Sequence, residues 1–407
     1  MLFCNLIIVE EILRIFNVIA YILIYFLFQE PFYEIYTNNV IRKDNMATIK
    51  DIANKLGISV STVSKGLNGA KDISAALRQE VLETAVEMGY TGRKTQRKSQ
   101  KRLCIFIENM DYESTSQFGY DIVLGFRQAA YKEQCEVVIQ PVSHEFQVNE
   151  KYDTYMLGNG FSGAFLLGFS LEDPWMEQLK TTAFSTVLLD NFIEKNPNVG
   201  YIGTDSEEGI ALAIEHLTKL GHEKIAFLDG SRGSMVSDLR MIAYLDSMTR
   251  HRLPVDPNLA VYGYFVADAA HYHVPTFLDL GATAILCGND LIASGVIEEC
   301  TRRGYKVPED ISVIGFDDLP IAEHLNPPLT TVKQDRLEIG KCGFYILRAM
   351  TEHISLSKNL LRPSLSVRSS TAIAKPRLAK RHSAEKDSVR NLNPELYSQF
   401  QQHRQIR

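Results

Sequence analysis

The chain has 407 residues, of which 45% are hydrophobic and 23% charged, and its formal net charge is −6. These values are typical of a globular protein with two or three domains, and the acidic balance argues against a chain that coats nucleic acid along its whole length. Between Met46 and Arg102, however, eleven Lys/Arg accompany five Asp/Glu, so the rest of the chain is acidic. This asymmetry predicts a small nucleic-acid-binding head on a neutral or acidic body.

The first 45 residues precede the first clear helical pattern. Residues 15–28 (IFNVIAYILIYFLF) form an apolar run of fourteen residues, whereas a membrane span needs about 20. The segment also lacks the basic start and the small-residue cleavage site of a signal peptide. We interpret residues 1–45 as the product of an over-extended start site, because Met46-Ala47 stands directly before the first helix. An interfacial or membrane-anchoring helix is the alternative.

The pattern from Met46 to Tyr90 predicts three short helices that share one small core, because apolar residues recur at helical spacing. Residues that can cap or end these helices stand at the expected places: Thr48 with Asp51, Gly57, Ser59, Asn68-Gly69, Ser74 and Gly89. The first two helices, joined by a tight glycine turn, describe a helix-turn-helix whose second helix enters the major groove of DNA. A generic three-helix bundle is the alternative.

From Leu103 onward, apolar strands alternate with amphipathic helices. The strand-like segments are LCIFIE, EVVIQPV, GAFLLG, STVLLD, KIAFLDG, LAVYGYF, TAILCG and ISVIGFDD. Continuous apolar strands between helices indicate parallel sheets covered on both faces. Because there are more strands than one small sheet needs, we predict an α/β body of two doubly wound parallel-sheet subdomains. Residues 375–407 are charged and Gln-rich with little periodicity, which predicts a disordered tail.

No cofactor, metal or catalytic constellation is expected. The cysteines are scattered, which argues against a zinc site or a disulfide framework and favours small buried residues in a reducing cytoplasm. GNGFSG (158–163) precedes its strand instead of following one, so we interpret it as a tight turn and not as a dinucleotide site. HYH (271–273) has no acidic or cysteine partner at ligand spacing, which favours a surface helix over a metal site.

Five segments stand in a distinctive order: TIKDIANKLGISVSTVSKGLNG, LRQEVLETAVEMGY, HLTKLGHEKIAFLDG, VPEDISVIGFDD and PPLTTVKQD. In sequence and order they resemble signatures of the lactose-repressor (LacI/GalR) family of bacterial transcription regulators, from Thr48 to Ala374. The resemblance implies a helix-turn-helix head at 46–91, a basic hinge at 92–102, and an effector-binding and dimerisation body at 103–374. That body is similar to periplasmic binding proteins.

The resemblance also implies DNA contacts in the head. The positions that read bases in the family are Val60, Ser61 and Lys65. The positions that contact phosphates are Thr48, Ser59, Thr62, Ser64 and Asn68. Hydroxyl groups suit phosphate oxygens, and a lysine can donate to guanine acceptors. Lys65 stands where many relatives carry arginine, so bidentate reading of guanine is weaker here.

The hinge departs from the family pattern. Relatives usually have Pro-Asn followed by an Ala/Leu helix that inserts leucine into the minor groove, whereas TGRKTQRKSQKR has six cations and no apolar wedge. We therefore expect phosphate or minor-groove contacts in place of leucine intercalation. The candidate residues are Arg93, Lys94, Arg97, Lys98, Lys101 and Arg102. A solvated spacer is the alternative.

In the body, the resemblance implies an effector in the cleft between the subdomains. The matching residues are Phe118, Tyr120, Asp190, Arg240, Phe265 and Asp290. Carboxylates and a guanidinium bind vicinal hydroxyls, and aromatic faces stack on sugar rings, so a small carbohydrate is the expected effector. A structural salt bridge is the alternative for Arg240 and Asp290, and a place in the core is the alternative for the others. Asp317-Asp318 follows a strand end, and a purely structural role stays open for it.

Together these patterns predict a cytoplasmic, homodimeric transcriptional regulator, a repressor, that binds double-stranded operator DNA under control of a small-molecule effector. The rival from another class is a membrane-tethered sugar-binding protein, and a second rival is an α/β enzyme.

Overall fold

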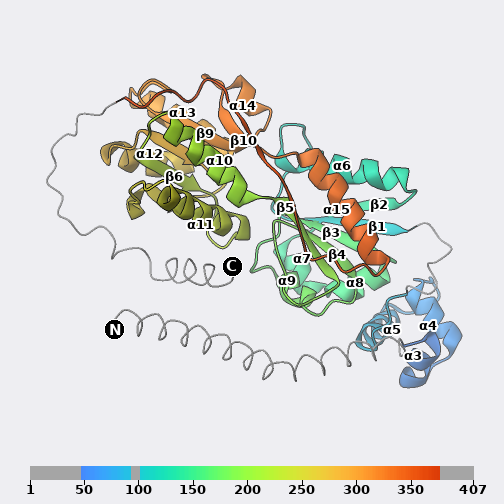
Figure 1. Ribbon diagram of the computed structural model, residues 1–407. Helices are drawn as coiled ribbons and strands as arrows, with labels where there is room; N and C mark the ends of the chain where they lie inside the picture. The colour runs from blue at the N-terminus through green and yellow to red at the C-terminus, as the bar shows by residue number, and fades with distance from the viewer. Residues whose placement is uncertain (1–46, 93–100, 376–407) are drawn as a thin grey trace, which may run out of the picture. The chain divides into compact units, whose positions relative to one another are not determined.

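The computed structural model describes residues 47–92 and 101–375, and these form two compact units that divide between Tyr90 and Thr91 (Figure 1). The predictions for residues 1–45, for residues 376–407 of the tail, and for Arg93, Lys94, Arg97 and Lys98 lie outside the described residues. None of the helices within the described ranges has the length and apolar content that a membrane crossing needs.

The first unit contains the three predicted helices, α3 (Ile49–Leu56), α4 (Val60–Leu67) and α5 (Ala75–Glu87). Thr48 and Asp51 form a capping box at the start of α3, and Gly57 ends that helix with φ +65°. Ser59 caps α4 and Ser74 caps α5, each accepting a bond from a backbone N–H three residues on. The capping prediction is confirmed, because Thr48, Ser59 and Ser74 each accept a bond from an N–H that the helix leaves unpaired, while the N–H of Gly57 donates to carbonyl oxygens in the last turn of α3.

One small core holds this unit together. Ile52, Val63, Val81 and Ala85 are fully buried between the helices. Gly66 allows α4 to approach α5 closely, because a Cβ there would stand 3.0 Å from the Val81 side chain. A surface ion pair from Lys55 to Glu87 joins α3 to the end of α5.

The second unit has two α/β lobes, each built on a six-stranded sheet within residues 101–375. The sheet of the first lobe has the strand order β11-β5-β4-β3-β1-β2 and is parallel throughout. The elements of this lobe are β1 (Arg102–Ile107), α6 (Phe118–Lys132), β2 (Glu136–Pro141), α7 (His144–Asn149), α8 (Tyr152–Gly158), β3 (Gly163–Leu167), α9 (Pro174–Leu179), β4 (Ser185–Leu189), β5 (Val199–Thr204), α15 (Arg336–Thr351) and β11 (Lys358–Leu361).

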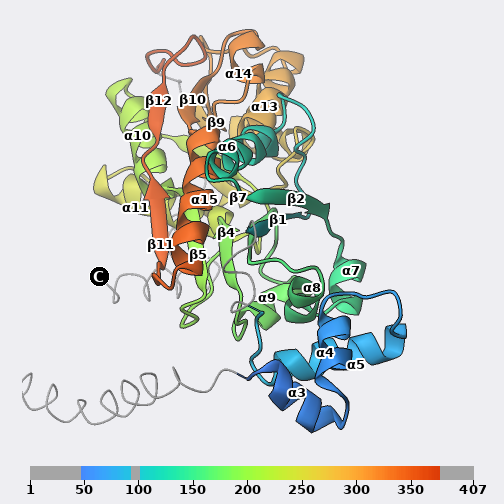
Figure 2. The same ribbon diagram turned by 90° about the vertical axis from the view of Figure 1, so that its right-hand side faces the viewer.

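The sheet of the second lobe has the order β12-β10-β9-β8-β6-β7 and is parallel except for β12, which runs antiparallel to β10. Its elements are α10 (Ser206–Lys219), β6 (Ile225–Asp229), α11 (Met235–Arg250), a 3₁₀ turn (Pro257–Leu259), β7 (Ala260–Tyr262), α12 (Ala269–Asp279), β8 (Ala284–Cys287), α13 (Asp290–Arg302), β9 (Ser312–Asp317), α14 (Ile321–His324), β10 (Thr330–Lys333) and β12 (Ser364–Ser366). The chain passes between the lobes after β5, β10 and β11, and Figure 2 shows the strap from β11 to β12.

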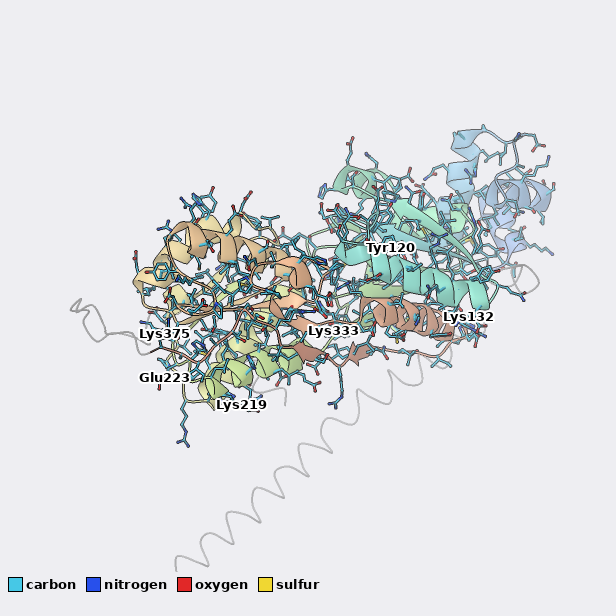
Figure 3. The ribbon with its side chains drawn as sticks, turned by 90° about the horizontal axis from the view of Figure 1, so that it is seen from above. Tyr120, Lys132, Lys219, Glu223, Lys333 and Lys375 are labelled. Carbon is cyan, nitrogen blue, oxygen red and sulfur yellow. The ribbon has the colours of Figure 1, made fainter. Side chains whose placement is uncertain are left out.

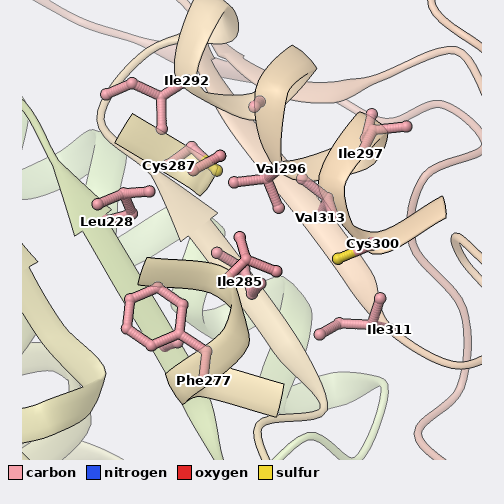
Figure 4. Close-up of a cluster of buried hydrophobic side chains, with 14 of the residues drawn as sticks. Leu228, Phe277, Ile285, Cys287, Ile292, Val296, Ile297, Cys300, Ile311 and Val313 are labelled. Atoms are coloured by element: carbon pink, nitrogen blue, oxygen red, sulfur yellow. The ribbon is translucent and has the colours of Figure 1, made fainter. Parts of the chain in front are cut away.

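Each sheet is covered on both faces, as the continuous apolar strands predict. In the second lobe, α12 and α13 cover one face with a core that includes Phe277, Ile285, Val296 and Val313 (Figure 4). In the first lobe, α6 and α15 cover one face and α7, α8 and α9 cover the other (Figure 1). Trp175 lies at the centre of an aromatic cluster on that second face, with its ring centroid 5.0 Å from that of Phe106.

All eight predicted strands are present, but LAVYGYF is a strand only from Ala260 to Tyr262. Four further strands, β5, β10, β11 and β12, were not predicted from the sequence. The strand β5 (VGYIGT) is interrupted by two glycines, and the other three strands have three or four residues each. Such short or glycine-containing segments carry no periodic signal, so only pairing with a neighbouring strand defines them.

Candidate DNA-binding and effector sites

The helix α4 presents one polar, accessible side. Val63 and Gly66 face the core, while Ser59, Val60, Ser61, Lys65 and Asn68 are exposed and Thr62 and Ser64 are half-buried. Val60 is an apolar side chain that is 49% exposed, so it is available for contact with an apolar group such as a thymine methyl. Every α4 residue predicted to contact DNA is therefore accessible.

Three hydroxyl groups gather at the N-terminus of α4. Oγ of Ser59 lies 2.7 Å from Oγ of Ser61 and 2.8 Å from Oγ1 of Thr62, and it also accepts a bond from the Thr62 N–H at 3.1 Å. Hydroxyls beside the unpaired N–H groups of a helix N-terminus are suited to a phosphate oxygen. Thr48 is engaged differently, since its hydroxyl bonds to Asp51 at 2.7 Å.

The other end of α4 carries an amide and a cation. Nδ2 of Asn68 donates to the Ser64 carbonyl at 2.8 Å, so this side chain closes the last turn of the helix. Nζ of Lys65 contacts Oδ2 of Asp72, in the turn that leads to α5. Lys65 is the charged member of the three predicted base-reading residues, and its ammonium group already has a partner within the head.

In the body, carboxylates stand at the carboxyl ends of strands from both lobes. Asp190 directly follows β4, Asp229 ends β6 and Asp317 ends β9. Arg240, from α11, is 3% exposed and interacts electrostatically with all three carboxylates. We call Asp190, Asp229, Asp317 and Arg240 the carboxyl-edge cluster. It brings the first lobe, through Asp190, together with the second.

The guanidinium of Arg240 is held by two fixed contacts. Nη1 donates to the carbonyl oxygen of Gly288 at 2.6 Å, and the guanidinium carbon lies 3.8 Å from the centroid of the Phe316 ring. These contacts leave Nε buried and without a hydrogen-bond partner. The arginine is thus oriented by the protein while one of its donors stays available.

Burial raises the pKa of each carboxyl in the cluster, and the positive charge of Arg240 partly offsets that rise. The pKa is about 6 for Asp190, about 7 for Asp229 and about 6 for Asp317. Asp317 also accepts a bond from Nε2 of Gln334 at 2.6 Å, which favours its charged form. The cluster therefore takes up and releases protons close to neutral pH.

Three further buried polar atoms, in the cluster or near it, also lack hydrogen-bond partners within the described residues. They are Oγ1 of Thr204, Oδ2 of Asp229 and Oγ of Ser237. An aromatic ring lies close by, since a Cβ on Gly230 would stand 2.1 Å from the ring of Phe265. Buried polar atoms without partners are costly, so these atoms are suited to bind hydroxyl groups or water.

Comparison with known proteins identifies the family to which the head and the body are similar. A family model described as bacterial regulatory proteins, lacI family, matches residues 48–92, and one described as a periplasmic binding protein-like domain matches residues 214–371. The chain is 27% identical to the HTH-type transcriptional repressor CytR of Escherichia coli (strain K12) over 339 residues, which cover 81% of this chain and 98% of CytR. The chain belongs to the LacI family of bacterial regulatory proteins. It is a DNA-binding transcriptional repressor and not an enzyme.

Further relatives of this LacI-family repressor match it over nearly their whole length. PurR of Vibrio atlanticus (strain LGP32), also an HTH-type transcriptional repressor, is 28% identical over 304 residues, which cover 74% of this chain and 91% of PurR. The lac repressor dimer bound to operator and an anti-inducer is 25% identical with a TM-score of 0.57, and the match covers 81% of this chain and 100% of that one. The transcriptional regulator CelR in complex with cellobiose has a TM-score of 0.60 at 24% identity, with coverage of 80% and 99%.

The structure of the LacI-family repressor brings together only part of the residue set predicted for the effector. Asp190 and Arg240 meet in the carboxyl-edge cluster. Phe118 packs against the core of the first lobe. Figure 3 shows Tyr120 and Lys132 at opposite ends of α6, with Tyr120 half-buried.

Asp290 is fully buried, and both of its oxygens are engaged within the protein. They accept bonds from the Leu319 N–H and from Oγ1 of Thr331, both at 2.6 Å. An effector contact at Asp290 stays a prediction. Its neighbour Asn289 is 7% exposed and caps α13 through its side-chain oxygen, with Nδ2 turned to the Phe265 carbonyl at 3.4 Å.

Sequence reasoning missed several polar residues around the cluster: Tyr201, Thr204, Asp229, Ser237, Asn289 and Gln334. Asp229 could have been found, because it ends the predicted strand KIAFLDG in the same way that Asp317 ends ISVIGFDD. The two motifs set aside behave as expected. GNGFSG forms a turn between α8 and β3 with Gly160 at φ +67°, and the HYH segment lies on α12, where His271 is exposed and 3.4 Å from Glu299.

The pKa of Asp229 leads to a pH prediction for this repressor. Since the pKa of Asp229 in the folded state (about 7) exceeds the ordinary value of 3.8, the folded state holds a proton between these pH values that the unfolded state releases. The free energy of unfolding should therefore fall as the pH rises through this window, by up to about 1.4 kcal/mol per unit, and level off above pH 7. Asp229→Asn cannot titrate, so it should gain stability relative to wild type from pH 5 to pH 7 in urea unfolding.

The control is Asp279→Asn, an exposed carboxylate of the same lobe. Its stability difference from wild type should not change with pH. A pH-independent difference for Asp229→Asn as well would contradict the raised pKa.

Proposed function

We propose that this repressor is controlled by a small, uncharged carbohydrate-type effector bound at the carboxyl-edge cluster. The observation that carries the proposal is the set of buried polar atoms without partners around Arg240, next to the ring of Phe265. Each hydroxyl of a sugar both donates and accepts, so one polyol can serve Oδ2 of Asp229, Oγ of Ser237 and Nε of Arg240. The aromatic ring suits the apolar face of a sugar.

The charge of the cluster narrows the effector class. Three carboxyl groups surround one guanidinium, so a phosphate or carboxylate on the effector would meet net negative charge when those groups are ionised. A neutral polyol instead donates hydrogen bonds to the carboxylates, which stabilises their charged form. Two proteins of similar fold are known in complex with neutral sugars, one with cellobiose and one with ribose.

An effector that contacts both lobes can change how the lobes are arranged. Arg336 links the lobes: its Nη2 donates to Oδ2 of Asp121 at 3.1 Å in the first lobe, and its Nη1 donates to the Asp317 carbonyl at 2.8 Å in the second. An effector that binds Asp190 and Arg240 together favours one arrangement of the lobes over another. The resulting population shift changes affinity for operator DNA.

For the DNA site, we propose the domain organisation and contacts expected from the family. The head is 46–91, the basic hinge 92–102 and the body 103–374, and the protein acts in the cytoplasm as a homodimer on a pseudo-palindromic operator. Val60, Ser61 and Lys65 read bases. The proposed phosphate contacts are Thr48, Ser59, Thr62, Ser64 and Asn68, with Arg93, Lys94, Arg97 and Lys98 from the hinge. The accessible hydroxyls at the start of α4 support this assignment.

A thermal-shift screen tests the effector class. The panel contains neutral mono- and disaccharides, their phosphate esters, and nucleosides. We expect at least one neutral sugar to raise the melting temperature, because a ligand that binds only the folded state stabilises it, and we expect its phosphate ester to have no effect. A shift with nucleosides alone, or a stronger shift with a phosphate ester, would refute the proposed class.

Replacing Lys65 with alanine tests base reading. The probes are the duplex that the wild-type protein enriches from a random pool (the selected duplex) and a duplex of the same composition in shuffled order (the shuffled duplex). Lys65→Ala should lower affinity for the selected duplex by about 1–3 kcal/mol and change affinity for the shuffled duplex less, because a lost base contact matters only where the base is present. Equal losses on both duplexes would make Lys65 a phosphate contact.

A further inference from the structure

Two acidic side chains are buried against each other in the first lobe. Glu108, which directly follows β1, is 5% exposed, and Asp173, which precedes α9, is 6% exposed. Their carboxyl groups form a hydrogen bond with each other. A carboxylate oxygen only accepts hydrogen bonds, so one of the two groups has to carry a proton. The pair, which we call the acid pair, therefore holds one proton.

The polar contacts of the acid pair come from neutral groups. Nε2 of Gln147, on α7, donates to Oε2 of Glu108, and the backbone N–H of Ser170 donates to Oδ2 of Asp173 at 2.6 Å. Asp153 of α8 is bonded elsewhere, to Oγ1 of Thr182. The other charged or titratable side chains of the surrounding segments are exposed: Asp111, His144, Glu145, Glu150, Lys151, Glu172, Glu177 and Lys180. None of these exposed groups is bonded to the acid pair.

This environment makes the proton easy to lose near neutral pH. Burial, followed by the negative charge of Asp173, raises the pKa of Glu108 from its ordinary value of 4.5 to about 7. The bond from Gln147 offsets only part of that rise. Loss of the proton leaves two negative charges in contact at a buried site, where they repel each other more strongly than in water.

The acid pair fastens the start of α9 to the rest of the lobe. Asp173 caps neither end of a helix with its side chain but closes the loop 168–173 through the bond from Ser170. In the first turn of α9, the N–H of Trp175 donates to Oε1 of Gln147 at 3.2 Å, and the same amide donates to Glu108. One network of hydrogen bonds therefore joins β1, α7 and α9.

The other end of the same loop reaches the carboxyl-edge cluster. The carbonyl oxygen of Phe169 accepts a bond from Nδ2 of Asn191, which is 3% exposed. Asn191 directly follows Asp190, the residue that the first lobe contributes to the cluster. The loop 168–173 thus connects the acid pair to the first lobe's side of the proposed effector site.

We propose that Glu108 and Asp173 form a proton-sensitive brace, which holds the loop 168–173 and the start of α9 strongly while the two carboxyl groups share a proton and weakly after they lose it. Two carboxylates in contact favour separation of the loop from β1 and the entry of water. The brace itself stands on contacts within the first lobe. Its consequence for effector binding rests on the proposed function.

The fluorescence of Trp175 reports on the brace in the full chain, because it is the only tryptophan of the sequence. Its ring is fully buried and stacks on Phe169, with the centroids 6.3 Å apart. We expect the emission maximum of the folded protein to move to longer wavelength as the pH rises, in one transition with its midpoint at about 7, the pKa of Glu108. A constant emission maximum from about pH 5 to about pH 9 would refute the brace.

Amide variants remove the shared proton and keep the contact. In Glu108→Gln, the new amide can accept the bond from Gln147 and donate to Asp173, as the protonated acid does. The transition of Trp175 should disappear. Asp173→Asn has the same effect from the other side, since its amide can donate to Glu108 and still accept from Ser170. A transition that persists in both variants would overturn the proposal.

Three control variants exclude other sources of the transition. Glu172→Gln makes the same change of charge next to Asp173 but at an exposed side chain. His144→Gln removes the exposed histidine of α7, and Asp229→Asn removes a titrating group of the carboxyl-edge cluster. The transition should persist in all three. Its loss in any of them would assign the titration to that residue and contradict the brace.

Hydrogen exchange of residues 168–176 measures how strongly the brace holds. Because the closed pair binds a proton that the opened pair releases, opening becomes easier as the pH rises from about 5 to about 7, by up to about tenfold per unit, and then levels off. Protection factors, which correct for the intrinsic effect of pH on exchange, should fall accordingly in wild type. They should stay constant in Glu108→Gln, and an equal fall in that variant would count against the brace.

The consequence for the effector is measured with the neutral sugar that gives the largest thermal shift. The ratio of sugar affinities, Glu108→Gln over wild type, should rise from about one near pH 5 to roughly threefold near pH 8, because only wild type loses its brace. Titration of the carboxyl-edge cluster is common to both proteins and cancels in this ratio. A constant ratio would refute the link between the brace and the effector site. If Trp175 titrates as expected and no sugar binds, the brace stands and the proposed effector class fails.

Discussion

Replacing Gly125 with alanine should destabilise the body by about 3 kcal/mol or more, although alanine is the better helix former by about 1 kcal/mol. Gly125 lies in α6 where that helix crosses α15. A Cβ there would stand 2.1 Å from the backbone carbonyl oxygen of Leu337, and a Cβ on Gly340 of α15 would stand 2.0 Å from that of Ile122. Backbone atoms on both sides cannot rotate away, so the two helices would have to separate.

Urea unfolding of the full chain, followed by circular dichroism, measures this cost. The matched control is Gly343→Ala in α15, the partner helix of α6. There the added Cβ would meet the ring of Phe165 at 3.0 Å. A ring can shift by a few tenths of an ångström, so this variant should cost about 1 kcal/mol or less. Equal stability of Gly125→Ala and wild type would show that the two helices can separate at little cost.

The close contact at Gly125 could not be predicted from the sequence, although the sheets could. The alternation of apolar strands and helices predicted two parallel sheets correctly, because burial on both faces requires continuous apolar runs such as AFLLG and TAILCG. The close crossing of α6 and α15 joins segments more than 200 residues apart. No local pattern reports which glycine faces which carbonyl across such a distance.

The two sites also differ in how far the sequence could predict them. In the head, exposure of the α4 residues follows from helical spacing alone, since Val63 and Gly66 fix the buried side. In the body, the sequence predicted an effector contact at Asp290, whose oxygens are both engaged within the protein, and passed over Asn289 next to it. Neighbouring residues at the start of a helix point in different directions. A one-letter pattern therefore does not tell how the side-chain oxygens of either residue are engaged within the protein.

Replacing Arg240 with methionine should lower effector affinity by at least about a hundredfold, equivalent to about 3 kcal/mol. The stem volume is largely kept, but the cluster loses its only cation, and the Gly288 carbonyl loses a donor at 2.6 Å. The buried carboxyls of Asp190, Asp229 and Asp317 would then take up protons, since the positive charge of Arg240 lowers the pKa of each. Protonated carboxyls accept fewer hydrogen bonds from sugar hydroxyls.

Calorimetric titration with the neutral sugar that gives the largest thermal shift measures this loss. Arg250→Met is the matched control, because Arg250 lies on the same helix but pairs with Glu207 and Asp246 at the surface. It should bind the sugar as wild type does. Since Arg240→Met can also weaken folding, Asp229→Asn provides a second measure that keeps size and removes charge, and it should cost about tenfold or more. Wild-type sugar affinity in both Arg240→Met and Asp229→Asn would mean that the cluster only joins the two lobes, and the effector would have to bind elsewhere.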